Sequence, residues 1–498
     1  MRQLRWSVCW CSLAALALGA FPASAQGRGD DSATAATQQR ARRVEAGLRP
    51  AVSAEGEPGT SLRSRMEILG VPAVSVAVID GGRIAWARAW GVRSAGRPEP
   101  ADTATRFQAA SLSKPVAAAV ALTLVDRGTL ALDSPVNARL GGWKLGTSSG
   151  TDAPPVTLRQ LLSHSAGITA PGFRGYAAGE SVPTPDEVLA GSGTANSEPI
   201  RVDGAPGRWR YSGGGYVLAQ RAMEVAAGKA LPVLAQERVF APLALRSSGF
   251  VQHRDTTGNY AWGHDRRGLP LTGGWHVYPE TAAAGLWSTP SDLARFMLAV
   301  GTVGSGPRRL LSDSLTAAIR TPIAGQASLG WEVEGDGPAH RINHRGANEG
   351  YRAFMVFFPA TGQGAVVMTN ADNGGRLIDE LVRSIAEEYG WPALRAERLA
   401  ATDLPDSTSL RRLVGRYRFG PGDLVAQVEF QAGQLAVSLP WAPGRKLAGG
   451  ARDDFRFTDD GGTASFRRDS TGLGQVIEIP GPAGMPPIIG RREADTRK

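Results

Sequence analysis

Residues 107–126 read FQAASLSKPVAAAVALTLVD and join a polar Ser-x-x-Lys sequence to a long apolar run. The run from Val116 to Asp126 consists mostly of alanine, valine and leucine and ends at Arg127-Gly128, which predicts a buried helix. Pro115 limits where this helix begins, because its ring would meet the carbonyl four residues back, that of Ser111. We therefore expect the helix to begin at about Ser111, where its dipole favours developing negative charge.

Lysine is rare in this chain, although the chain is basic. It occurs only at Lys114, Lys144, Lys229, Lys446 and Lys498. Lys114 alone has a serine three positions earlier, and residues three apart share one face of a helix. A buried lysine can lose its proton, which an arginine does not. A hydroxyl beside such an amine predicts a serine nucleophile, whereas the alternative is a solvated lysine on a helix surface.

The first 25 residues have the pattern of a secretory signal peptide. A basic start is followed by the apolar stretch Leu13 to Phe21 and by the small residues Ala23-Ser24-Ala25. The apolar stretch is too short to span a bilayer in the mature protein, and no later stretch qualifies. Both cysteines, Cys9 and Cys11, lie in this segment, so the mature chain would have no thiol, disulfide or cysteine-based metal site. We expect a periplasmic or secreted protein without a metal or cofactor.

The formal charge of +9 does not predict a nucleic-acid partner. The arginines are scattered among acidic residues, and no basic run is interleaved with aromatic residues. General solvation explains this charge better than nucleic-acid binding.

Strand patterns stand at both ends of residues 56–395, with helical patterns between them. Residues 74–90 predict a β-hairpin around the turn Asp80-Gly81-Gly82, and residues 155–300 hold several helical stretches. Strand patterns return at Ser328 to Val333, Arg352 to Phe358 and Gly364 to Thr369, and a helix follows at about Arg376 to Tyr389. This order predicts an α+β domain whose antiparallel sheet is built from both ends, flanked by helices and interrupted by a helical insertion.

Two further segments flank this domain. Residues 26–55 are rich in Gly, Ala, Gln, Arg and Ser, which predicts a flexible linker. Residues 405–492 carry short alternating apolar runs punctuated by Gly, Pro and Asp, which predict a small all-β barrel or sandwich.

Three polar segments besides the Ser-x-x-Lys sequence could take part in chemistry. In residues 210–216, RYSGGGY, glycines let a substrate approach Tyr211, whose phenol could act as acid or base near a cation. In residues 343–351, NHRGANEGY, a glycine beside His344 would let an acyl substrate lie against a strand. In residues 157–168, TLRQLLSHSAGI, His164 could be a base, although a histidine that ends a helix and bonds its own loop is the more common case. A packed tyrosine and a polar hairpin loop are the structural alternatives for the first two segments.

In this order and spacing, these segments resemble the serine β-lactamase and penicillin-binding protein superfamily, in the branch of class C β-lactamases, DD-peptidases and family VIII esterases. The match covers roughly residues 60–390. The further segments that carry it are Phe107 to Lys114, Leu132-Asp133-Ser134-Pro135-Val136, Ala284 to Leu293 and His344-Arg345-Gly346. The tail resembles the lipocalin-like domains that are often fused behind this catalytic domain.

The resemblance implies a role for each matching residue. Ser111 would become acylated, Lys114 and Tyr211 would share the proton transfers, and the N–H groups of Ser111 and Ala347 would form the oxyanion hole. His344 would complete the catalytic set, and Gly346 and Gly213 would line the substrate site. Two departures argue against an efficient β-lactamase: Gly213 stands where Tyr-x-Asn motifs have asparagine, and His344 stands where lysine is common.

The substrate class stays open among small esters, D-amino-acid peptides such as those of the cell wall, and β-lactams. Two other hypotheses compete with a serine hydrolase that acts through Ser111. Residues 146–150, GTSSG, match the G-x-S-x-G nucleophile elbow of α/β-hydrolases around Ser148, but a polar loop precedes them and Thr151-Asp152-Ala153-Pro154-Pro155 follows. The chain could also be a non-catalytic binding protein whose site has decayed, although Ser111, Lys114 and Tyr211 are all present.

Overall fold

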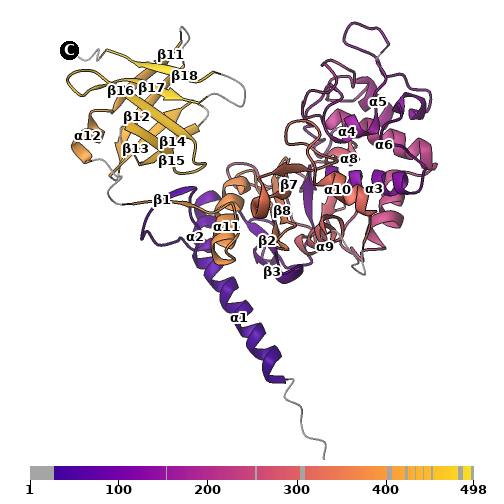
Figure 1. Ribbon diagram of the computed structural model, residues 1–498, viewed down its shortest axis with the longest axis horizontal. Helices are drawn as coiled ribbons and strands as arrows, with labels where there is room; N and C mark the ends of the chain where they lie inside the picture. Colours follow the sequence, from indigo (N-terminus) through magenta and orange to yellow (C-terminus); the bar gives the residue numbers. More distant parts are fainter. Residues whose placement is uncertain are drawn as a thin grey trace, which may run out of the picture.

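The computed structural model describes residues 27–494, apart from 153, 253–254, 303–308, 401–405, 421–423, 432, 441, 450–452 and 481–485. The predicted signal peptide therefore lies outside the described residues. Figure 1 shows a six-stranded sheet in the middle of the molecule, a helical part on one side of it and a β-barrel on the other.

The central sheet is antiparallel and joins both ends of the catalytic part of the chain. Its strands are, in order, β3 (Arg83–Gly91), β2 (Ala73–Asp80), β9 (Gln363–Thr369), β8 (Tyr351–Phe358), β7 (Arg341–Asn348) and β6 (Glu332–Glu334). The N-terminal hairpin meets the C-terminal strands where β2 pairs with β9. The predicted sheet, built from both ends around an insertion, is thereby confirmed.

The sheet separates two hydrophobic cores, because successive side chains of a strand point to opposite faces. In β2, Val74, Val76 and Val78 face one core, and Ala77 and Ile79 face the other. The first face is covered by α1 (Gly27–Ala46), α2 (Leu62–Leu69) and α11 (Gly374–Glu388). The second face is covered by α9 (Pro290–Gly301).

The insertion between the two hairpins forms the helical part. It carries the short sheet of β4 (Phe107–Ala110) and β5 (Leu286–Ser288). Its α-helices are α3 (Ser113–Asp126), α4 (Leu158–Leu162), α5 (Pro185–Ala190), α6 (Gly213–Ala227), α7 (Leu231–Ala235), α8 (Thr281–Ala284) and α10 (Asp313–Ile319). A π-helical turn, Gln236–Phe240, continues α7. Helix α3 is buried almost all round, as its continuous apolar run predicts.

The C-terminal part is a closed antiparallel barrel of β11 to β18. The strands are β11 (Gly415–Phe419), β12 (Val425–Gln431), β13 (Gln434–Leu439), β14 (Ala442–Gly449), β15 (Asp454–Phe457), β16 (Thr463–Arg468), β17 (Gly474–Ile479) and β18 (Ile488–Arg492). Its own core includes Tyr417, Phe455 and Phe466. The all-β prediction is confirmed, and the closed form is the barrel rather than the sandwich. The short helix α12 (Ser407–Arg411) precedes it.

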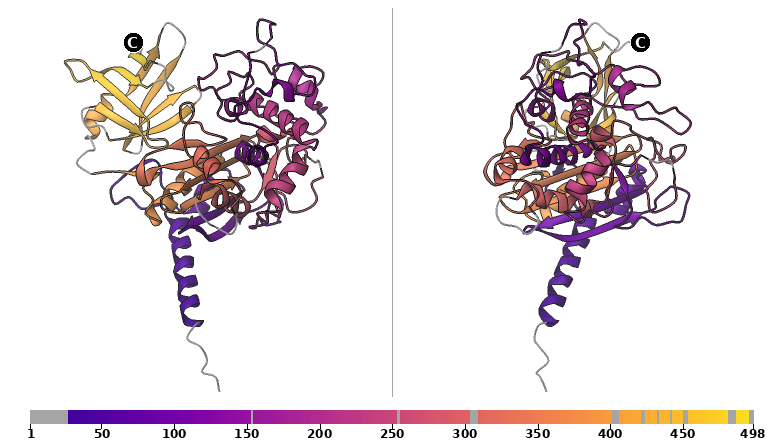
Figure 2. Two further views of the ribbon diagram at one scale, coloured as in Figure 1. Left: turned by 45° about the vertical axis from the view of Figure 1, so that its right-hand side comes forward. Right: turned by 90° about the vertical axis from the view of Figure 1, so that its right-hand side faces the viewer.

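The flexible-linker prediction for residues 26–55 is wrong for most of that range. Helix α1 begins at Gly27 and protrudes from the body of the molecule in all views (Figures 1 and 2). Only its last turns pack against α11, through the buried Ala41 and Val44. After it, β1 (Val52–Ala54) pairs in parallel with β10 (Glu397–Leu399). Alanine, glutamine and arginine favour a helix as well as a linker, and two buried residues leave little periodic signal.

Candidate active site

The predicted nucleophile lies at a sharp turn between β4 and α3. Ala110, directly before Ser111, has a left-handed backbone with φ 51°, which a residue with a side chain adopts only under strain. The turn leaves Ser111 half-buried. Helix α3 begins at Ser113, two residues later than expected, and its Lys114 N–H donates to the Ser111 carbonyl at 3.0 Å. Pro115 is then the third helical residue, where its missing N–H costs nothing.

Lys114 is buried beside this serine, with 2% of its surface exposed. Its Nζ donates to Ser111 Oγ at 3.0 Å and to the Ala283 carbonyl at 2.9 Å. The ammonium also lies 4.9 Å from the centroid of the Tyr211 ring. The amine is therefore positioned to exchange a proton with the serine hydroxyl directly.

Tyr211 reaches the site from the start of α6. Ser212 caps this helix by accepting from the Gly215 N–H at 3.0 Å, and its hydroxyl donates to the Thr169 carbonyl at 2.7 Å. The following glycines allow close packing, since a Cβ on Gly214 would come within 2.6 Å of the Thr169 carbonyl oxygen. The start of α6 is thus held against the loop at Thr169, which fixes the position of Tyr211.

His164 positions the same segment and does not contact Ser111 through any hydrogen bond of the described residues. It follows α4 with φ 56°, and its Nδ1 accepts from the Ser212 N–H at 3.1 Å. Its ring lies 4.4 Å from that of Tyr211. Burial, followed by the charge of Lys114, holds the pKa of His164 well below its usual value. The helix-ending interpretation therefore describes His164 well, except that the ring bonds α6 and not its own loop.

His344 faces the site from β7 as a neutral imidazole. Its side chain is buried, and its ring lies 6.3 Å from that of Tyr211. Burial and the charge of Lys114 lower the pKa of His344 to about 3. Because Nδ1 lies 2.7 Å from the Arg345 carbonyl, the neutral ring must carry its proton there and donate it. The site therefore has no fixed positive charge at this position.

Gly346 allows β7 to approach the nucleophile turn. A Cβ at this position would lie 2.4 Å from the Ala109 carbonyl oxygen and 3.2 Å from the Ala110 Cβ. The missing side chain of Gly346 thus makes room for β4, and the predicted part of Gly346 in binding a substrate stays a prediction. Asn348, two residues further on, donates to Gln108 Oε1 at 2.8 Å and strengthens the same contact.

The strand register directs the Ala347 N–H towards the open edge of the sheet. Asn348 and Tyr351 pair across a two-residue turn, and Ala347 pairs with Arg352 in the next position. Hydrogen-bonded and non-hydrogen-bonded pairs alternate in an antiparallel ladder, so the Ala347 N–H points away from β8. Strand β6 covers β7 only as far as Asn343. A substrate carbonyl at this edge could therefore accept from Ala347.

Sequence reasoning missed two groups that hold the site together. The Ser113 hydroxyl accepts from the Leu286 N–H at 2.9 Å and ties α3 to β5. The second acceptor for Lys114 is a backbone carbonyl, that of Ala283, and a carbonyl leaves no trace in the residue type. The sequence signal for Ser113 is that it is a second serine inside the Ser-x-x-Lys sequence, directly before a long apolar run.

Ser148, the competing nucleophile, lies elsewhere in an exposed loop. Its Oγ donates to Asp203 Oδ1 at 2.6 Å. The segment forms only isolated bridges, Gly146 with Asp152 and Thr147 with Val202, instead of a strand that leads into a helix. The elbow geometry that the G-x-S-x-G motif requires is therefore absent from this described loop.

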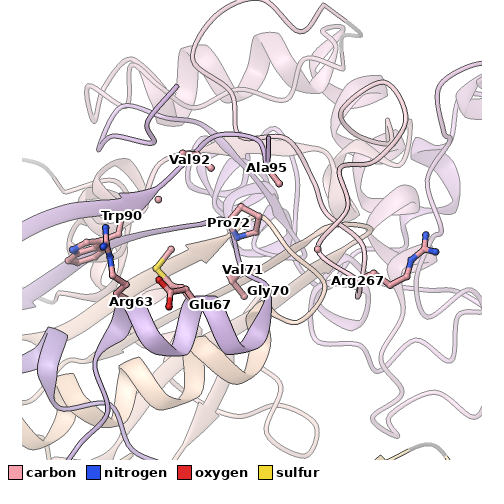
Figure 3. A pocket seen from close by; sticks show the side chains of 12 residues that line it. Arg63, Glu67, Gly70, Val71, Pro72, Trp90, Val92, Ala95 and Arg267 are labelled. Carbon is pink, nitrogen blue, oxygen red and sulfur yellow. The ribbon is translucent and has the colours of Figure 1, made fainter. Parts of the chain in front are cut away.

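A pocket of about 640 Å³ lies apart from these residues, between α2 and the adjoining ends of β2 and β3 (Figure 3). Its lining is mainly apolar and includes Met66, Pro72 and Trp90, together with the charged residues Arg63 and Glu67. None of the predicted site residues lines it. Within the described ranges, no group of three or more His, Cys, Asp or Glu side chains could hold a metal ion. No helix in the described part of the chain is long and apolar enough to cross a membrane.

Comparison with known proteins agrees with this geometry. The family model Beta-lactamase matches residues 60–388, so the chain belongs to the beta-lactamase family of serine hydrolases. It is 26% identical over 369 residues to Penicillin-binding protein 4 of Amycolatopsis lactamdurans, which covers 70% of this chain and 93% of that protein. It is 34% identical over 185 residues to Esterase EstB of Burkholderia gladioli, which covers 34% of this chain and 45% of the relative.

The fold is also similar to a solved structure, the octameric penicillin-binding protein homologue from Pyrococcus abyssi. The TM-score is 0.58 at 20% identity, over 86% of this chain and 98% of that one. The family match confirms the superfamily resemblance, and this structural similarity confirms the fold predicted from the sequence.

Proposed function

We propose that this protein hydrolyses carboxylic esters, and amides more slowly, through an acyl-enzyme on Ser111. The observation that carries the proposal is the 3.0 Å contact between Ser111 Oγ and the buried Lys114 Nζ. Lys114 and Tyr211 act as the acid and base, and the Lys114 nitrogen lies 4.9 Å from the centroid of the Tyr211 ring. His344 completes the site as a neutral group.

In the first half of the reaction, Ser111 Oγ attacks the substrate carbonyl and gives its proton to the Lys114–Tyr211 pair. The N–H groups of Ser111 and Ala347 bind the developing oxyanion, each donor worth about 3–4 kcal/mol in the transition state. The proton then passes to the leaving group. Water hydrolyses the acyl-enzyme by the same steps in reverse order, which frees Ser111.

The charge of the site favours neutral acyl substrates over β-lactams. A penicillin carries a carboxylate, and neutral His344 offers it no ammonium. The similarity to an esterase supports hydrolysis of esters by this protein. D-amino-acid peptides, or slow β-lactam turnover, are the second candidate, and the similarity to a penicillin-binding protein favours it.

We also propose that the chain is exported to the periplasm or secreted, on the strength of the signal-peptide pattern in residues 1–25. Expression of the full chain followed by N-terminal analysis of the mature protein tests this. A new N-terminus close to residue 26 is expected, and an uncleaved cytoplasmic product would contradict export.

The function is tested by intact-mass measurement after rapid mixing with p-nitrophenyl esters, D-Ala-D-Ala peptides and penicillin G. The wild type should gain the mass of one acyl group from the esters and release p-nitrophenol catalytically, and Ser111→Ala should do neither. Turnover of the peptides with no turnover of the esters would favour the second candidate. A wild type that is inert towards all three classes would support a decayed, non-catalytic site.

A further inference from the structure

The third residue of the Tyr211-Ser212-Gly213 segment has an aromatic ring where its side chain would be. A Cβ built on Gly213 would lie 2.8 Å from Cε2 of Phe173 and 3.3 Å from Cδ2. Real Cβ atoms do not approach a ring so closely. Any larger residue at Gly213 would therefore have to displace Phe173, so the two positions form a matched pair.

The space that Phe173 fills lies next to the segment that carries Tyr211. Ser212 has an extended backbone, with φ −143° and ψ 117°, so the side chains before and after it point to the same side. Tyr211 points towards Lys114 and His344 on that side, whereas the Ser212 hydroxyl turns away to Thr169. The Cβ direction of Gly213 therefore lies on the same side as the Tyr211 side chain, and Phe173 fills the place of a side chain there.

The Phe173 loop is held in this position on both sides. The Gly213 N–H donates to the Pro171 carbonyl at 3.2 Å. After Phe173, the Arg174 carbonyl accepts from the Tyr278 hydroxyl at 3.2 Å, and that same hydroxyl accepts from the Glu349 N–H at 3.0 Å. The loop is thus connected to the turn between β7 and β8. The ring itself packs on the core yet stays half-exposed, so part of its apolar surface remains accessible.

We propose that Phe173 is a specificity-determining residue that contacts the acyl side chain of the substrate, and that the Phe173–Gly213 pair selects apolar acyl groups over acylamino groups. This inference rests on the proposed ester hydrolysis at Ser111. An asparagine at position 213 would offer an amide to a polar acyl side chain. Here the Phe173 ring takes that place, and its edge offers no hydrogen-bond donor or acceptor. An amide in the acyl chain would therefore lose its hydrogen bonds to water without gaining new ones. An aliphatic chain gains contact area on the ring.

The test compares three p-nitrophenyl esters with one leaving group: acetate, hexanoate and N-acetylglycinate. Hexanoate and N-acetylglycinate have acyl chains of similar length, and acetate has only a methyl group beyond its carbonyl. The wild type should favour hexanoate over N-acetylglycinate by about tenfold in kcat/KM, after each rate is divided by that of uncatalysed hydrolysis. Phe173→Ala should lower kcat/KM for hexanoate about five- to tenfold, mainly through KM, and change acetate less than twofold.

Two further variants separate contact from structure. Phe173→Leu, which keeps an apolar side chain, should restore most of the hexanoate rate. The double variant Phe173→Ala with Gly213→Asn should raise the N-acetylglycinate rate relative to hexanoate, because an amide replaces the ring. If Phe173→Ala reduced acetate and hexanoate equally, or the wild type showed no preference, the specificity role would be overturned while the esterase function stood. If the wild type hydrolysed none of the esters, the proposed function itself would fail.

Discussion

Ser111 and Ser148 are two candidate nucleophiles in one chain, and their surroundings differ in every respect that matters to catalysis. Ser111 lies on a strained turn with a buried amine 3.0 Å from its hydroxyl. Ser148 lies in an exposed loop and donates to the carboxylate of Asp203, which is also exposed. The comparison teaches that a short motif identifies only a residue type. A serine is activated as a nucleophile when a buried basic group lies within hydrogen-bond distance of it.

The largest expected effect comes from removing each hydroxyl in turn. Ser111→Ala should reduce ester turnover by about 10⁴-fold or more, since the acyl-enzyme can no longer form. Ser148→Ala should leave kcat/KM within about twofold, because its exposed hydroxyl contacts only loop groups. Steady-state rates on p-nitrophenyl acetate measure both. Comparable losses in the two variants would erase the distinction between the two serines.

Replacing the amine should have the next largest effect. Lys114→Arg keeps the positive charge, but a guanidinium does not cycle a proton, so turnover should fall by about 10³-fold. Lys144→Arg, at an exposed lysine, is the matched control and should retain full activity. Near-normal rates in Lys114→Arg would refute the acid–base role of the amine. Thermal melts of both variants show whether folding is intact.

The two regions also contain glycines that can be compared directly. Gly346→Ala would place a methyl group 2.4 Å from the Ala109 carbonyl, so we expect a loss of about 1–3 kcal/mol in unfolding free energy and at least about tenfold in activity. Gly146→Ala, in the Ser148 loop, would meet its nearest atom at an ordinary 3.7 Å. Urea unfolding with parallel rate measurements should show no more than a few tenths of a kcal/mol for the second variant. Equal stability of the two variants would show that β7 does not need the close approach.

The last expected effect is the pH dependence of stability that His344 contributes in the Ser111 region. The folded-state pKa of His344 is about 3 and the ordinary value is 6.5, so between these values the unfolded chain binds a proton that the folded chain excludes. Stability should therefore fall as the pH drops below 6.5, by up to about 1.4 kcal/mol per pH unit for this one group. His344→Gln should remove this contribution and flatten the slope between pH 6.5 and pH 4.5 in urea unfolding. A slope identical to that of the wild type would contradict the buried neutral histidine.

Much of the fold could be predicted because its signals are local. The alternating valines of β2, the apolar run of α3 and the amphipathic α11 each show their period in the sequence, and the structure has them close to the predicted bounds. Helix α3 begins two residues after its predicted start, because the left-handed Ala110 and a turn precede the helix. Helix α1 was missed because most of its surface is polar.

The site was predictable only where side-chain chemistry marks it. Ser111, Lys114, Tyr211 and His344 stand out by residue type, and the structure brings them together. The Ala283 carbonyl and the Phe173 ring come from parts of the chain that carry no distinctive pattern. Their importance depends on packing distances, such as the 2.8 Å between Phe173 and a Cβ on Gly213, and no single sequence contains these.

The most direct test is to locate the acyl or phosphonyl group after labelling. The wild-type protein is treated with a fluorophosphonate, digested and mapped by mass spectrometry, with Lys114→Arg run in parallel. A single adduct on the peptide that contains Ser111, formed much more slowly in Lys114→Arg, is the expected result. An adduct on Ser148, or equal labelling of Ser111 in both proteins, would contradict an active serine that depends on the buried amine.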